Sequence, residues 1–160
     1  MGVVALGHEC ASGTDSNFNN SVILGTGSVS GNRVNFGNSV ILGSYILNSL
    51  TTAGAVILSQ NNVLLGSNIL TSATSACAGN IVIGESVGSS ITTGINGCVW
   101  IGGNGVNGES NSIRIGSNMT NCYISGIHGS SIGDRSLNVK VDSNGKLFTS
   151  VNARPCAKIS

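Results

Sequence analysis

The chain is poor in charge, proline and aromatic residues. Charged residues make up 8% of its 160 residues and aromatic residues 4%, and Pro155 is its one proline. An average soluble domain carries roughly 25% charged residues. With a net charge of +1 the chain has no electrostatic footprint for nucleic acid, so we expect no nucleic-acid partner. Its hydrophobic fraction of 40% argues against intrinsic disorder, which needs low hydrophobicity or high net charge.

Long apolar runs and metal-binding patterns are also missing. No stretch approaches the roughly 20 apolar residues of a membrane helix, so we expect no membrane insertion. The five cysteines, at 10, 77, 98, 122 and 156, form no CxxC pair, and we predict neither a metal nor a cofactor. Their odd number permits one interchain disulfide, for which Cys156 near the chain end is the candidate. Buried free thiols are the alternative, because free cysteine packs as a small hydrophobe.

One short phrase recurs along the chain: an aliphatic residue, any residue, an aliphatic residue and glycine. It occupies residues 4–7, 22–25, 40–43, 63–66, 81–84, 99–102 and 113–116. The glycines at 7, 25 and 43 are 18 residues apart, as are those at 66, 84 and 102, whereas 23 residues separate Gly43 from Gly66. Self-similarity at a fixed period predicts a stacked solenoid, in which each coil contacts mainly its neighbours.

The phrase predicts the course of each coil. A short strand ends at a glycine bend, a second short strand follows, and a polar segment returns the chain. The extra residues before Gly66 predict a loop or one irregular coil at 51–60. We therefore expect an all-β fold, with β-solenoid repeats of about 18 residues over 1–127, a hairpin at 128–150 and a tail at 151–160. Alternation around Asn144-Gly145 predicts the hairpin, which we expect to close the open sheet edge at the C-terminal end.

The middle residue of the phrase should be polar if it faces water. It is apolar in every phrase up to Trp100 and becomes polar only at Arg114. On a single chain such a column would form a continuous apolar ridge, and extended apolar patches mark interfaces. We therefore predict a homo-oligomer whose subunit interface contains Ile23, Ile41, Leu64, Val82 and Trp100.

Residues 20–25 and 38–43, both Asn-Ser-Val-Ile-Leu-Gly, resemble the head repeats of trimeric autotransporter adhesins of the YadA type. In those adhesins the repeats wind into a left-handed β-roll, with three chains side by side. Residues 98–149 look like the end of the fibre β-solenoids of phage tail fibres, bacterial surface proteins and giant-virus proteins. The resemblance implies a homotrimer on a virion surface or an extracellular cell surface. Its implied partners are further fibre or capsid subunits and a host glycan or receptor.

Three functions are compatible with the residues. The first is a structural and adhesive fibre module that binds through side loops at 51–60 and 71–79. The second is an acyltransferase of the left-handed hexapeptide β-helix class, which shares the 18-residue coil and a six-residue subperiod but needs a histidine for general acid–base chemistry. His8 and His128 are the two histidines, and neither has a carboxylate at telling spacing. The third, an ice-binding solenoid, needs a threonine ladder, and the pairs Thr51-Thr52 and Thr92-Thr93 do not repeat in register. We rank the fibre module first and predict no catalytic residue.

Overall fold

The computed structural model describes residues 2–10, 17–29, 34–48, 57–124, 139–143 and 145–149. All regular structure in these ranges is β, which confirms the predicted all-β solenoid. They contain no helix, and therefore none long and apolar enough to cross a bilayer. The chain divides into two units, Met1–Thr120 and Asn121–Ser160.

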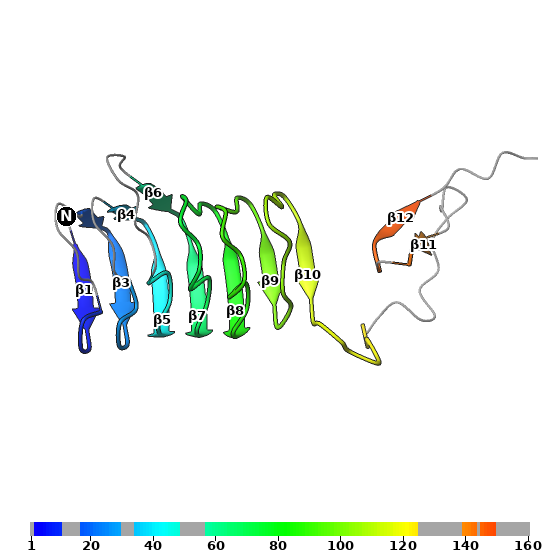
Figure 1. Ribbon diagram of the computed structural model, residues 1–160, viewed down its shortest axis with the longest axis horizontal. Coiled ribbons are helices and arrows are strands. Elements are labelled where there is room, and N and C mark those ends of the chain that lie inside the picture. Colours follow the sequence, from blue (N-terminus) through cyan, green and yellow to red (C-terminus); the bar gives the residue numbers. More distant parts are fainter. Residues whose placement is uncertain are drawn as a thin grey trace, which may run out of the picture. The chain divides into compact units, whose positions relative to one another are not determined.

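The first unit is built on a seven-stranded parallel sheet, the main sheet (Figure 1). Each strand pairs with the next in the register of the sequence phrase, so that Gly43 lies beside Gly66 and Gly66 beside Gly84. The 23-residue spacing therefore leaves the main sheet undisturbed. In order, its strands are β1 (Val3–Leu6), β3 (Ser21–Leu24), β5 (Val40–Ser44), β7 (Val63–Ser67), β8 (Ile81–Glu85), β9 (Val99–Ile101) and β10 (Ile113–Ile115).

A second parallel sheet, the side sheet, forms the other strand-bearing wall of the early coils. It consists of β2 (Asn17–Asn19), β4 (Val34–Gly37) and β6 (Ile57–Gln60). Isolated parallel bridges join Ala78 to Asn96 and Asn96 to Ser110 in the later coils. Residues 57–60 of the expected loop are thus a regular strand, whereas 51–56 lie outside the described residues.

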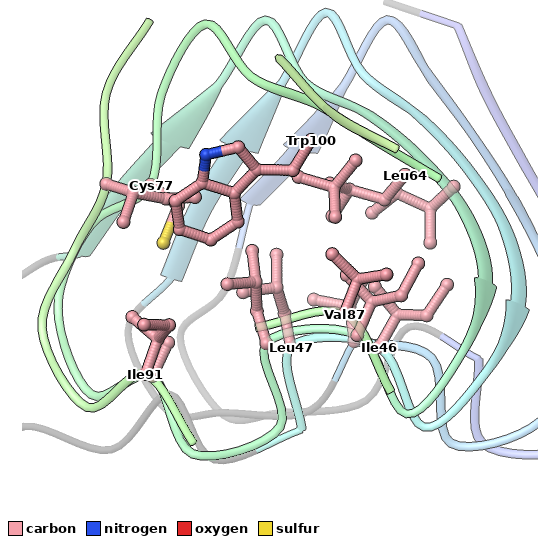
Figure 2. Close-up of a cluster of buried hydrophobic side chains, with 14 of the residues drawn as sticks. Ile46, Leu47, Leu64, Cys77, Val87, Ile91 and Trp100 are labelled. Carbon is pink, nitrogen blue, oxygen red and sulfur yellow. The ribbon is translucent and has the colours of Figure 1, made fainter. Parts of the chain in front are cut away.

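The middle column of the phrase lies inside the coil, not on its surface. Ile23, Ile41, Leu64, Val82 and Trp100 are all 0% exposed in the single chain. Figure 2 shows side chains of this column pointing toward side chains of the opposite wall, such as Leu47 and Val87. The predicted ridge at these five positions is therefore wrong, because each coil needs large apolar side chains to fill its own interior.

Glycine is required at or just after the end of each early main-sheet strand. Gly25, Gly43 and Gly66 have φ angles of 143°, 141° and 139°, a region that L side chains rarely adopt. A Cβ atom on Gly43 would also overlap the carbonyl group of Gly66 in the next coil. The repeated glycine thus sets both the bend and the close stacking of the coils.

A ladder of buried or half-buried side chains joins the coils at the start of each main-sheet strand from β3 onward. Its members are Ser21, Ser39, Asn62, Asn80, Cys98 and Ser112. At its centre, the backbone N–H of Asn80 donates to Oδ1 of Asn62 at 3.1 Å, and the N–H of Cys98 donates to Oδ1 of Asn80 at 3.0 Å. Nδ2 of Asn80 also donates to the Ile95 carbonyl at 2.9 Å. The ladder pairs groups that would be costly to bury without partners.

In the second unit, β11 (Val139–Val141) pairs antiparallel with β12 (Leu147–Thr149). The backbone N–H of Lys146 donates to Oδ1 of Asp142 at 2.9 Å, and Gly145 has a φ of 78°. His128, Cys156 and the tail at 151–160 lie outside the described residues. The expected disulfide cysteine is therefore not placed.

Candidate interaction face

The outward side of the main sheet is aliphatic along its whole length. It carries two columns, one on each side of the buried middle column, and together these columns form what we call the aliphatic face. One column is entirely β-branched: Val4, Val22, Val40, Val63, Ile81, Val99 and Ile113. The other holds four leucines and then three isoleucines: Leu6, Leu24, Leu42, Leu65, Ile83, Ile101 and Ile115.

Several residues of this face remain accessible within the sheet. Val40 and Leu42 are 38% and 37% exposed, and Ile81 and Ile101 are both 40% exposed, whereas Val63 and Leu65 on the central strand β7 are half-buried. Seven strands about 4.8 Å apart span about 29 Å, and residues two apart along a strand lie about 7 Å apart. With side-chain width included, the face covers about 300–400 Å². Patches of about this size on a monomer are often functional.

The side sheet shows that an apolar exterior is not a general property of this chain. Phe36 and Ser59 point inward from β4 and β6 and are 0% exposed. The outward positions are mostly polar instead: Asn17 lies beside Asn35, and Asn19 and Gln60 flank Gly37, with Leu58 beside Asn35 as the apolar exception. The two sheets therefore share an inward-facing core and differ in their outer faces. This difference distinguishes the outer face of the main sheet from that of the side sheet.

Sequence reasoning expected an exposed apolar ridge at the middle column of the phrase, whereas the exposed apolar positions are those on either side of that column. The phrase is apolar at three successive positions, so alternation alone does not say which set faces inward. The missed signal was the constancy of the two flanking positions, which are aliphatic in all seven phrases. The middle position, by contrast, varies in size and polarity from Ala5 to Trp100 to Arg114.

Of the two histidines considered for acyl transfer, His8 lies on the surface of the first coil. Nδ1 of His8 is 4.0 Å from Oε2 of Glu9, and both side chains are largely exposed. No group of three His, Cys, Asp or Glu side chains in the described ranges could hold a metal ion.

The expected binding segment at 71–79 follows the coil wall, with Ala73 and Cys77 both fully buried. Burial raises the pKa of the Cys77 thiol, which keeps it protonated and unreactive at neutral pH. Thr92 accepts hydrogen bonds at its carbonyl from the N–H and hydroxyl of Thr74. The Thr93 hydroxyl accepts one from the N–H of Gly108.

The chain matches no protein-family model, and no curated protein or solved structure is significantly similar to it.

Proposed function

We propose that the chain is a structural module of a virion-surface or cell-surface fibre and that it assembles as a homotrimer through the aliphatic face. The observation that carries this proposal is the contrast between the outer faces of the two sheets. Fourteen aliphatic side chains line the outside of the main sheet, whereas four of the six outward positions of the side sheet are asparagine or glutamine and only Leu58 is aliphatic. A second copy of the same face supplies an apolar partner of matching length.

The shape of the face supports side-by-side association. A standard interface buries about 800 Å² per partner, with an apolar core and a polar rim, so the aliphatic face has the size of such a core. Three copies arranged around a common axis would place the β-branched column of one chain against the leucine–isoleucine column of the next. The choice of three copies follows the resemblance to trimeric adhesin heads and fibre solenoids.

In this arrangement the outer face of the side sheet and the coil corners remain in water. These surfaces would carry the adhesive role, with a host glycan or receptor as ligand. Further fibre or capsid subunits would be the structural partners. These ligands and partners follow from the resemblance.

The proposal is tested by the native mass of the full chain and two matched lysine variants. Light scattering should give three times the chain mass of 16.0 kDa, with and without reductant. Leu42→Lys places a charge at the centre of the aliphatic face and should give a folded monomer, with its β-sheet circular dichroism retained. Asn35→Lys places the same charge on the side sheet and should remain a trimer.

A wild-type monomer would contradict the proposal, as would an unchanged mass for Leu42→Lys. A dimer that Leu42→Lys dissociates would retain the aliphatic face as the contact and refute the trimer. Equal loss of assembly in both variants would show that added charge, not its position, is responsible.

A further inference from the structure

The two ends of the main sheet carry nearly the same phrase. β1 contains Val4-Ala5-Leu6 followed by Gly7, and β10 contains Ile113-Arg114-Ile115 followed by Gly116. Both are edge strands, and an open strand edge is a template for pairing with another chain. If the β1 edge of a second copy stacked on β10, in the register that joins β9 to β10, both columns of the aliphatic face would continue without a break.

The inward position is where this continuation fails. Arg114 lies beside Trp100 in the sheet register, one strand beyond the last apolar member of the middle column. Its Nε donates to Oε2 of Glu109 at 2.7 Å, and its Nη2 donates to Oε1 at 2.8 Å. The end of the interior column is therefore occupied by a bidentate ion pair.

This ion pair still has access to water. The Arg114 side chain is 38% exposed and that of Glu109 is 18% exposed. The hydrogen bond from Arg114 holds the pKa of Glu109 below its usual value, so both groups are charged at neutral pH. A second copy stacked on β10 would remove both charges from water and place them against Ala5, which offers no polar side chain. Desolvating an ion pair in this way is costly, and inward-pointing charges are one of the devices that protect sheet edges.

We propose that the Glu109–Arg114 ion pair blocks the C-terminal end of the main sheet against the β1 edge of a second copy, so that copies do not stack end to end. This inference is independent of the proposed trimer, because it concerns the edges of the sheet and not its outer face. In this role the ion pair limits the length of the assembly along the stacking axis.

The test removes the pair from the full-length chain without changing its net charge. In Glu109→Leu/Arg114→Ile the inward position becomes apolar, as it is in the preceding strands. Light scattering over a hundredfold concentration range should give a constant mass for the wild type. For the double variant the mass should rise at least fivefold, in multiples of the wild-type particle, and electron microscopy should show rods. Glu85→Gln, which removes an exposed carboxylate from β8, is the control and should keep the wild-type mass.

A compensating change identifies the receiving edge. Adding Ala5→Lys to the double variant places a charge at the inward position of β1 and should restore the wild-type mass. A folded double variant that keeps the wild-type mass would overturn the proposal, as would association that Ala5→Lys does not reverse. If the double variant does not fold, Glu109→Gln/Arg114→Thr replaces it, because this pair of changes also removes both charges and threonine suits a strand, and the same outcomes apply. Leu42→Lys added to the double variant should prevent association through the aliphatic face but leave end-to-end stacking in place, so it separates the two kinds of assembly.

Discussion

Replacing Gly43 with alanine should force two neighbouring coils apart. The φ angle of Gly43 is 141°, which alanine adopts only with strain. A Cβ atom at this position would overlap the carbonyl oxygen and carbon of Gly66. Both obstructing atoms belong to the backbone of the next coil, so no change of rotamer relieves the overlap. Relief requires β5 and β7 to separate where they pair from Val40 to Ser44.

The expected cost follows from these two effects. Strain in a glycine-only region of φ and ψ costs about 1–3 kcal/mol, and each weakened hydrogen bond between buried groups adds about 1 kcal/mol. We expect Gly43→Ala to lower the free energy of unfolding by about 3–5 kcal/mol. That is a large part of the roughly 5–15 kcal/mol that a folded domain possesses. Urea unfolding followed by circular dichroism at equal protein concentrations measures the difference.

Two other glycines separate the strain from the overlap. Gly102 has a φ of 62°, but a Cβ atom there would meet nothing within 4 Å, so Gly102→Ala should cost only about 1–2 kcal/mol. At Gly37, whose φ is not positive, the nearest atom would lie 3.6 Å from the added Cβ atom, and alanine should cost about 1 kcal/mol or less. The reasoning is refuted if Gly43→Ala costs no more than Gly102→Ala.

Three further results are expected. Asn80→Ala removes the hydrogen-bond partners of the buried Ile95 carbonyl and Cys98 N–H and should lower the free energy of unfolding in urea by about 2–4 kcal/mol. Exposed Asn17→Ala, the control, should cost less than about 1 kcal/mol, and an equally small loss for Asn80→Ala would contradict the stabilising role of the ladder. Arg114 lowers the pKa of Glu109 in the folded protein. The ionised carboxylate should therefore stabilise the fold fully above its unfolded pKa of about 4.3, and this stabilisation should be lost as the pH falls through the pKa of Glu109 in the folded protein. The difference in unfolding free energy between the wild type and Glu109→Gln should therefore stay constant near neutral pH and shrink below about pH 4. A difference that grows on acidification would contradict a stabilising role for the ionised Glu109 carboxylate. In a Cys156→Ser background, a thiol reagent should modify exposed Cys122 rapidly, and buried Cys10, Cys77 and Cys98 only after unfolding; more than one fast thiol per chain would show that the coils open.

The strand register could be predicted from the sequence because stacking constrains it strongly. Each repeated glycine must lie over its counterpart in the next coil, as Gly43 does over Gly66. The insertion between these two glycines did not alter this, because the extra residues are accommodated outside the main sheet. The period therefore predicted the parallel pairing and the repeat of the coil.

The orientation of the strands could not be read from the same phrase. Val22, Ile23 and Leu24 are all apolar, and a hydrophobicity pattern distinguishes two faces only when one of them is polar. What turns Ile23 inward is the need of the coil to fill its interior against residues such as Ile46 and Val87, which follow the glycine bend. This packing depends on the path of the whole coil and not on the strand alone.

The polar ladder and the ion pair at the end of the sheet also could not be predicted from spacing. Asn80 and Cys98 differ in chemistry, yet they occupy equivalent positions because their neighbours supply the matching donors and acceptors. Glu109 and Arg114 are five residues apart, a separation that pairs no side chains in a regular strand. The turn before β10 brings them together.

The direction of the hydrogen bonds between coils decides how the solenoid responds to mechanical load. These bonds run along the stacking axis, so tension between the two ends of the first unit acts on one pair of strands at a time. The coils should peel off in succession at low force instead of shearing together. Each 18-residue coil that occupies about 4.8 Å in the stack would release about 60 Å of extended chain. A fibre that contained the proposed module would lengthen in steps under tension, and each unfolding step would lower the force on the rest of the fibre.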